Sequence, residues 1–368
     1  MRSRISVLAA AGLIALGGLT ACTSGGGDST TSSGTKISGP GKVGVILPDT
    51  ETSQRWGTDD PKLLKAAFAA ADVPVDIQNA DGDKEKFKRI ADEMISGGAK
   101  VLMIVNLDSA SGKAVLDEAR AAGVKTVDYD RLTLNGGADY YVSFDNKAVG
   151  ELQGKGLVQC LTAKGVKVPK IAELNGSPDD NNATLFKAGY DSILQPLYDD
   201  AVYLKGPDQA VDDWDNDEAT VVFREMWNQT GKGINGVLAA NDGLANSVIQ
   251  ILRQSGKNGE VPVTGQDATV PGLQNVLAGD QCMTVYKPIK KEADAAADLA
   301  IKLYKGEQAT AAGRVKDTES GAYVPSVLLQ PQAIFKKDVG SVIKDGFVEK
   351  KAVCAGRFAA FCAPNGIN

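Results

Sequence analysis

Histidine is absent from all 368 residues of the chain. Because histidine is the usual general base near neutral pH and the commonest metal ligand, its absence excludes Ser-His-Asp and Cys-His catalytic systems and histidine-ligated zinc. The five cysteines include no Cys-x-x-Cys pair, which argues against a cysteine-ligated metal. The sequence therefore predicts a protein that is not an enzyme and that carries no metal and no cofactor.

Positive charge and aromatic side chains are also scarce. Lysine and arginine number 40 against 46 aspartates and glutamates, which leaves a net charge of -6, and aromatic residues make up only 6% of the chain. Nucleic-acid-binding proteins present a basic surface and often stack bases on aromatic rings. We therefore expect no nucleic-acid partner.

The first residues have the organisation of an export signal. Residues 1–21 begin with two arginines, continue into an apolar stretch at 7–19 and end in Leu-Thr-Ala directly before Cys22. This pattern is typical of a secretory signal peptide rather than a membrane span. The last four residues resemble a bacterial lipobox, in which cleavage precedes a lipid-modified cysteine. We predict a signal peptide at 1–21, lipid attachment at Cys22 and an extracytoplasmic protein anchored to the cell membrane.

A flexible tether is predicted at residues 22–40. This segment is rich in glycine, serine and threonine, and Ile37 is its only large apolar residue. Such a composition cannot bury a hydrophobic core. The tether would hold a folded body close to the membrane.

The remaining cysteines lie in a chain that we expect to be exported, where disulfides form. They are Cys160, Cys282, Cys354 and Cys362. Four cysteines allow three pairings. Their short separation favours a bond between Cys354 and Cys362, and the sequence leaves the other pairings open.

Short β-branched runs alternate with longer helix-like segments from residue 42 onward. The first strand-like runs are 42–48, 73–78, 100–106 and 124–130, and the helix-like segments between them are 61–71, 84–96 and 112–121. Similar strand-like runs follow at 169–174, 201–206, 234–240, 261–267 and 281–288. This alternation predicts βαβ units with parallel sheets, and the length suits two domains.

Polar and aromatic side chains stand at the carboxyl ends of these predicted strands, where parallel sheets bind ligands. They occur in Gln54-Arg55-Trp56, Asp130-Arg131, Asp180-Asn181-Asn182, Trp214, Asn241-Asp242, Gln266-Asp267 and Lys287. Any one of them is also explained as a turn residue or helix cap, as are Asp83 and Asn241. As a set they combine bidentate hydrogen-bonding groups, which suit vicinal hydroxyls, with aromatic faces, which suit the C–H face of a pyranose. Together they predict a sugar site.

Several of these residues lie in segments that resemble a known family. The segments are QRW, VDYDR, YYVSFDNKAVGELQ, NGSPDDNNATLFKAG, DDW, AANDGLA, TGQDA and MTVYKP. Over residues 41–335 they resemble the D-xylose-binding branch of the type I periplasmic sugar-binding proteins, the recognition subunits of ABC importers. The resemblance implies an α/β fold in which two Rossmann-like lobes with parallel sheets are joined by a three-crossover hinge and close around a monosaccharide.

The resemblance also implies a division of the chain. The first lobe would hold 41–145 plus 288–323, and the second would hold 146–287 plus 324–368. All four remaining cysteines would then lie in the second lobe, so that disulfides within it would leave closure free. The tail after Phe335 extends beyond the family core and receives no function.

The resemblance further implies the residues that contact the sugar. They are Arg55, Trp56, Asp130, Arg131, Asp180, Asn182, Trp214, Asn241, Asp267 and Lys287. Trp56 and Trp214 would enclose the ring, and the others would hydrogen-bond its hydroxyls. The implied function is a monomeric receptor that binds D-xylose, or a related aldose such as glucose, and delivers it to an ABC permease. Because none of these side chains titrates near neutral pH unless burial shifts it, we expect affinity to vary little there.

Other interpretations use the same residues. A receptor of the same fold could bind a nucleoside or a signalling furanone instead. Carboxylate pairs such as Asp179/Asp180 or Asp212/Asp213 could serve a glycosidase, which needs two carboxylates. The segment 79–85 alternates acidic residues as a calcium loop does, but Lys84 and Ile90 replace the glycine and glutamate that an EF-hand requires, so we interpret it as a turn and helix cap.

Overall fold

The computed structural model describes residues 41–368. The predicted signal peptide at 1–21, the lipid attachment at Cys22 and the tether at 22–40 lie outside the described residues.

The first lobe is built on a seven-stranded sheet with the order β10-β11-β5-β4-β3-β1-β2. Its strands are β1 (Lys42–Leu47), β2 (Val75–Asn79), β3 (Ala99–Ile104), β4 (Lys125–Tyr129), β5 (Tyr140–Phe144), β10 (Gly313–Lys316) and β11 (Tyr323–Leu329). All neighbours pair in parallel except β10, which is antiparallel to β11 at the sheet edge.

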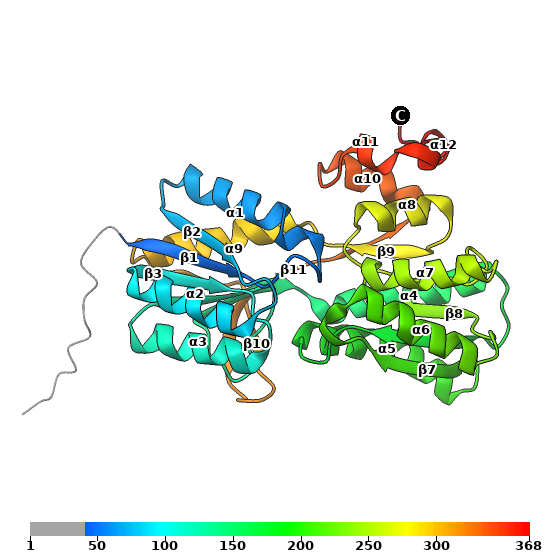
Figure 1. The fold of residues 1–368 in the computed structure, drawn as a ribbon, viewed down its shortest axis with the longest axis horizontal. Helices are drawn as coiled ribbons and strands as arrows, with labels where there is room; N and C mark the ends of the chain where they lie inside the picture. The colour runs from blue at the N-terminus through cyan, green and yellow to red at the C-terminus, as the bar shows by residue number, and fades with distance from the viewer. Residues whose placement is uncertain (1–40) are drawn as a thin grey trace, which may run out of the picture. The chain divides into compact units, whose positions relative to one another are not determined.

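Helices cover both faces of this sheet, as the mostly apolar strands require. They are α1 (Asp59–Ala70), α2 (Lys84–Ser96), α3 (Ser109–Ala121) and α9 (Ile289–Tyr304). One apolar core joins the sheet to α1 and α9, and a second joins it to α2 and α3 on the other face (Figure 1). Asp83 caps α2 by accepting a hydrogen bond from the Lys86 amide, which confirms the interpretation of 79–85 as a turn and cap.

The second lobe contains the parallel sheet β7-β6-β8 and the antiparallel pair β12-β9. The strands are β6 (Lys170–Asn175), β7 (Leu204–Ala210), β8 (Gly236–Ala239), β9 (Met283–Tyr286) and β12 (Gln332–Phe335). The helices are α4 (Asn146–Ala163), α5 (Asn181–Asp199), α6 (Asn216–Gln229), α7 (Asp242–Gln254) and α8 (Val270–Ala278). One large apolar core joins these elements.

The segment 261–267, which we predicted to be a strand, contributes only an isolated bridge between Val263 and Val237. One reason is that Pro262 has no amide proton to donate to a neighbouring strand. The Val237 amide donates to the carbonyl of Pro262, and the Cys282 amide donates to that of Val263. The segment thus links β8 to β9 without forming a regular strand.

Three connections join the two lobes. They lie between β5 and α4, between β9 and α9, and between β11 and β12. Parallel lobes joined in this way have the α/β architecture that the resemblance implied. The third connection comes later than the expected boundary at residue 323, because residues 326–329 of β11 pair with β5 in the first sheet.

The C-terminal tail folds onto the second lobe. It contains α10 (Val339–Lys344), α11 (Lys350–Val353) and α12 (Ala359–Cys362), and short 3-10 turns flank these helices at Lys336–Asp338, Gly356–Phe358 and Ala363–Asn365. Their apolar residues pack with those of α8 and with Tyr286 (Figure 1). The predicted disulfide between Cys354 and Cys362 is confirmed, and Cys160 of α4 is bonded to Cys282.

Within residues 41–368, no helix combines the length and apolar character needed to cross a bilayer.

Candidate ligand-binding site

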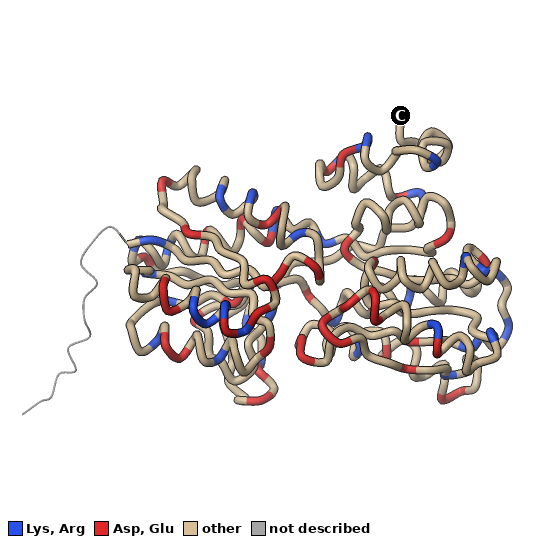
Figure 2. The backbone as a smooth tube through the Cα atoms, in the orientation of Figure 1, with Lys and Arg blue, Asp and Glu red and all other residues tan. Residues whose placement is uncertain are grey.

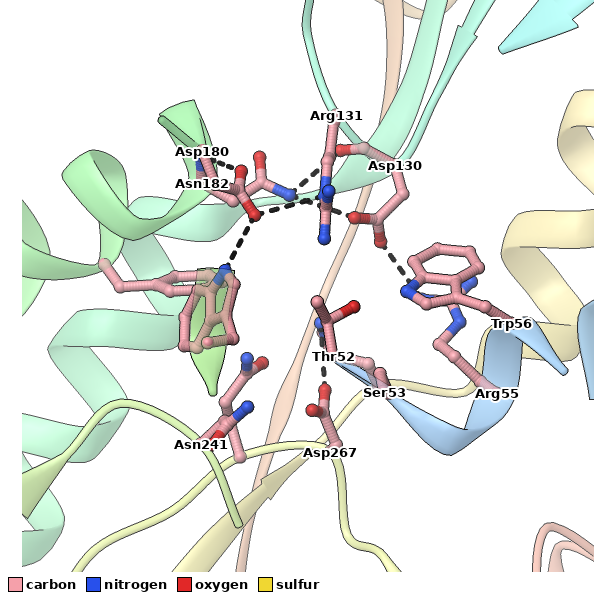
Figure 3. A pocket seen from close by; sticks show the side chains of 14 residues that line it. Thr52, Ser53, Arg55, Trp56, Asp130, Arg131, Asp180, Asn182, Asn241 and Asp267 are labelled. Carbon is pink, nitrogen blue, oxygen red and sulfur yellow. Dashed lines mark hydrogen bonds and ion pairs between the residues drawn. The ribbon is translucent and has the colours of Figure 1, made fainter. Parts of the chain in front are cut away.

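All ten residues predicted to contact a ligand line one cavity between the lobes (Figure 3). The space inside it that the centre of a water-sized molecule can occupy is about 40 Å³. Its lining also includes Thr52, Ser53, Phe186 and Gln266. The lining side chains therefore lie close together around a small space.

The cavity residues stand where strands end. Arg55 and Trp56 form the 3-10 turn η1 (Gln54–Trp56) that follows β1. Asp130 and Arg131 follow β4 directly, and Lys287 follows β9. Because parallel strands end at the same edge of a sheet, residues far apart in the sequence meet there.

Two cavity residues are also helix caps. Asp180 caps α5 by accepting from the Asn182 amide, and Asn241 caps α7 by accepting from the Leu244 amide. Capping and lining the cavity are therefore compatible roles, because each side chain has further hydrogen-bonding capacity. The cap interpretation of Asn241 is correct, but it does not exclude a place in the site.

Three of these residues have left-handed backbone conformations, which help to place their side chains at the cavity. Asp130 has φ 64°, Trp214 in the 3-10 turn η2 (Asp212–Trp214) has φ 57°, and Asp267 has φ 97°. Such conformations cost residues other than glycine about 1–3 kcal/mol and persist where the surroundings enforce them. Next to Trp214, a Cβ on Gly176 would lie 2.0 Å from the indole Cη2, so only glycine lets the ring occupy this place.

The two tryptophans are buried at the cavity, with exposed fractions of 3% for Trp56 and 6% for Trp214. The Arg55 guanidinium lies 4.2 Å from the centre of the Trp56 ring, an arrangement that fixes this ring by cation–π attraction. The indole nitrogen of Trp214 donates to Asp180 at 3.3 Å. Trp56 lies across the cavity from Asp180 and Asn182 (Figure 3).

Direct bonds join the two lobes at the cavity. Arg131 Nε lies 3.1 Å from Asp180 Oδ2, and Asn182 Nδ2 donates to Asp130 Oδ1 at 3.0 Å. Asp130 and Arg131 belong to the first lobe, whereas Asp180 and Asn182 belong to the second. The structure thus has its lobes in contact around the cavity.

Comparison with known proteins identifies the family. The family model described as "Periplasmic binding protein domain" matches residues 43–308. This chain belongs to that family. Among curated relatives, it is 35% identical to the D-xylose-binding periplasmic protein of Escherichia coli (strain K12), over 83% of this chain and 90% of the relative. It is 33% identical to the multiple sugar-binding periplasmic receptor ChvE of Rhizobium radiobacter, over 83% of this chain and 90% of the relative.

Solved structures agree with the family. A solute-binding protein from Clostridium phytofermentans with bound β-D-glucose matches with a TM-score of 0.79 and 28% identity, over 84% of this chain and 99% of that one. A carbohydrate transporter solute-binding protein from Chloroflexus aurantiacus, in complex with D-glucose, matches with a TM-score of 0.77 and 27% identity, over 84% and 97%. These matches confirm the two-lobed periplasmic binding protein fold.

Fixed charges line the cavity of this periplasmic binding protein. Burial opposes the ionised form of Asp130, but the positive charges of Arg55, Lys287 and Arg131 outweigh burial and lower its pKa. Burial likewise opposes the charge of Lys287, but Asp267 and Asp130 raise its pKa. Lys287 Nζ lies 3.1 Å from Asp267 Oδ1. Asp130 and Lys287 therefore stay ionised at neutral pH.

The chemistry of the lining suits a neutral polar ligand. Carboxylates and amides accept or donate hydrogen bonds, arginine and lysine donate, and the aromatic rings present apolar faces. Within residues 41–368 there is no cluster of acidic or cysteine side chains that could hold a metal ion. A polyhydroxylated molecule with apolar C–H faces fits this combination.

An acidic entrance adjoins the cavity. A second pocket, which shares Thr52, Arg131, Asp180 and Trp214 with the first, lies between loops of the two lobes. Acidic residues dominate these loops, as Figure 2 shows in red; they are Asp49, Glu51, Asp81, Asp213, Asp215 and Asp217. Lys84 pairs there with Asp108 at 2.5 Å. The negative charge of this pocket disfavours anions nearby.

The C-terminal tail lines a pocket beside the site. A pocket that shares Ser53, Arg55, Asp267 and Lys287 with the cavity is bounded by residues 347–349 and 352 of the tail. The sequence assigned no role to these residues, because nothing in their pattern indicates which surface they cover.

Sequence analysis named Gln266 among the strand-end residues but missed three other residues of the lining. Thr52 and Ser53 precede the expected motif in an ordinary loop. Phe186 lies within α5, where an apolar residue indicates only core packing. Only the assembled fold shows that its ring reaches the cavity.

Proposed function

We propose that this protein is an extracytoplasmic monosaccharide-binding receptor of an ABC sugar importer. It binds D-xylose, or a related aldose such as glucose, and delivers it unchanged to a permease. The observation that carries the proposal is the single small cavity in which carboxylates, amides, cationic groups and two tryptophans converge. The relatives named for D-xylose and for several sugars support the ligand class.

The side chains have distinct roles in this proposal. Trp56 and Trp214 lie against the two faces of the sugar ring, where their burial excludes water. The charged and amide residues exchange hydrogen bonds with the hydroxyls; these residues are Arg55, Asp130, Arg131, Asp180, Asn182, Asn241, Asp267 and Lys287. Hydrogen bonds to charged groups contribute about 1.5–3 kcal/mol each, so a few of them give a small ligand substantial affinity.

Ligand binding stabilises the closed arrangement, because only closed lobes place residues of both lobes around the sugar. The closed receptor then docks as a monomer on the permease. A lipid on Cys22 keeps the protein at the outer face of the cell membrane, and the tether at 22–40 lets it reach the permease. The lipobox-like sequence supports the anchor.

The cavity carboxylates favour a receptor over a glycosidase. A glycosidase needs one protonated carboxylic acid beside the scissile bond. Here Asp130, Asp180 and Asp267 are each paired with arginine or lysine, and the surrounding positive charges lower the pKa of Asp130. Incubation with p-nitrophenyl glycosides should therefore release no nitrophenol, and turnover would contradict the proposal.

Isothermal titration calorimetry with a ligand panel tests the function. The panel contains xylose, glucose, galactose, arabinose and ribose, with adenosine as the nucleoside alternative. We expect saturable binding of at least one aldose with a stoichiometry of one, recovery of the sugar unchanged, and no binding of adenosine. Binding of adenosine without any aldose would overturn the sugar assignment.

A further inference from the structure

Glu292 is a fully buried carboxyl group directly behind the cavity. It lies in the first turn of α9, has no exposed surface and does not line the cavity. Its Oε2 accepts from Arg55 Nη2 at 2.7 Å. Its Oε1 is buried and has no hydrogen-bond partner among the described residues. A buried polar atom without a partner is costly, so this oxygen needs an explanation.

Arg55 is the residue through which Glu292 reaches the site. Its Nε and Nη2 both bond to Asp60 at 2.7 Å, and Nη2 also bonds to Glu292. Its Nη1 bonds to Asp130 at 3.0 Å. A guanidinium has five N–H groups, so this network leaves one N–H, on Nη1, for a ligand. The network therefore sets the direction of that donor.

The ionised form of Glu292 would place too much negative charge around Arg55. The titratable and charged groups that face Glu292 from the neighbouring elements are Arg55, Asp60, Tyr129, Asp130, Tyr141 and Lys287. Asp60, Asp130 and Glu292 share one guanidinium, and Lys287 is already paired with Asp267. Burial raises the pKa of Glu292 to about 8; Arg55 opposes this shift, and Asp130 and Asp60 add to it.

The carboxyl groups of Glu292 and Asp130 bond to the same guanidinium, at Nη2 and Nη1 of Arg55 respectively. Two ionised carboxylates on one guanidinium repel each other, whereas a protonated one can donate a hydrogen bond to its neighbour. With Oε2 bonded to Arg55, the atom left to carry the proton is Oε1. A proton on Oε1 thus lets the unpartnered oxygen form a hydrogen bond. It also removes the excess negative charge around Arg55.

We propose that Glu292 is a positioning residue of the sugar site that acts in its protonated form, donating to Asp130 and so orienting the Asp130–Arg55 pair toward the ligand. This inference rests on the proposed sugar-binding function. When Glu292 loses its proton, its charge repels Asp130 and draws Arg55 away, so the free donor and acceptor no longer match the ligand. Near the pKa of Glu292, sugar binding is therefore accompanied by the uptake of a proton.

The wild-type protein provides the first test. Titration of the best aldose at pH 8 in phosphate and in Tris, which differ in ionisation enthalpy, measures the protons bound per sugar. We expect uptake of about half a proton at pH 8 and an affinity up to about tenfold lower at pH 9 than at pH 7. The described chain has no histidine, and its four cysteines are in disulfides. The other buried carboxyl groups with pKa values raised to about 7 are Asp128 and Asp242, and neither lines the cavity.

The variant Glu292→Gln provides the second test, because glutamine keeps the shape of the protonated acid and cannot ionise. We expect sugar binding near the pH 7 wild-type affinity, no proton uptake and no loss of affinity up to pH 9. Asp298→Asn, an exposed position in the same helix, is the control and should keep the wild-type pH profile. A merely structural role for Glu292 would not change the proton count.

Two results would overturn the inference. One is a wild-type protein that binds sugar with equal affinity and no proton uptake from pH 7 to pH 9. The other is a folded Glu292→Gln variant that retains the wild-type pH profile. Absence of sugar binding by the wild type at every pH would instead refute the proposed function.

Discussion

Asp267 combines a strained backbone conformation with a place in the cavity lining. Its left-handed backbone and its pairing with Lys287 hold the carboxylate at the cavity. Under the proposed function, replacing it with alanine removes charge-assisted hydrogen bonds to the sugar, and it leaves Lys287 buried without this partner. We expect Asp267→Ala to weaken aldose binding by about 2–4 kcal/mol, measured by calorimetry.

The control for this substitution is Glu260→Ala, an exposed residue that precedes the same segment and pairs only with Lys257. It should leave the affinity unchanged. Wild-type affinity in Asp267→Ala would refute the role of this carboxylate.

The tryptophans provide an optical test of the ring contacts. The chain has three tryptophans, and the third, Trp227, is packed against Phe223 in the core of the second lobe. A fluorescence change on adding sugar should therefore come from Trp56 and Trp214. We expect Trp56→Ala and Trp214→Ala each to lose a large part of the change, while Trp227 contributes a constant background. A full-sized response in both variants would contradict the ring assignment.

At the scale of elements, the site depends on close packing behind it. Gly176 follows β6, and any Cβ there would overlap the Trp214 ring. We expect Gly176→Ala to displace this ring and to weaken sugar binding by at least about tenfold, because overpacking forces side chains off their positions. Fluorescence titration measures the affinity.

Gly340→Ala is the matched control, because a Cβ at Gly340 in α10 makes only an ordinary contact of 3.6 Å with Ile367. It should bind as the wild type does. Equal affinity in Gly176→Ala would mean that Trp214 is not needed where the structure has it.

Elements were predictable where their pattern is local. The sequence predicted β1, α2, β3 and β4 to within a few residues. It could do so because a buried strand shows as a β-branched run and a half-buried helix shows as an amphipathic pattern. The segment 261–267 was predicted as a strand but forms only one bridge, at Val263, next to a proline that lacks an amide donor. The folded tail was missed because its apolar residues pack against α8, and the local sequence pattern does not show this contact.

For the whole molecule, which lacks histidine, buried carboxyl groups determine how stability depends on pH near neutrality. Burial raises the pKa of Asp128 and of Asp242 to about 7 and that of Glu292 to about 8, although hydrogen bonds from Thr133 and Gln281 oppose the first two shifts. Each group binds its proton more tightly in the folded state than in the unfolded chain. The stability linked to these protons is complete below about pH 4 and is lost as the pH rises toward 8.

We therefore expect the Tm to fall by about 5 °C between pH 5 and pH 8.5, measured by scanning calorimetry without ligand. Glu292→Gln should reduce the upper part of this slope, whereas Asp298→Asn should not. A Tm that rises over this interval would contradict the assigned protonation states.

The sequence alone determined the α/β class and the residues that meet at the cavity. It could do so because parallel strands bring their carboxyl ends to one edge, and polar residues at successive strand ends are visible in the order of the chain.

Only the tertiary structure decided what surrounds those residues. Glu292 lies in a helix rich in alanine, lysine and acidic residues, where it looks like a solvent-exposed position. Its contact with Arg55 spans 237 residues of sequence. Burial and a neighbouring charge set the protonation of a carboxyl group, and both arise only when distant segments pack together. The lack of histidine excluded the common proton carrier, and the fold supplied a buried glutamate in its place.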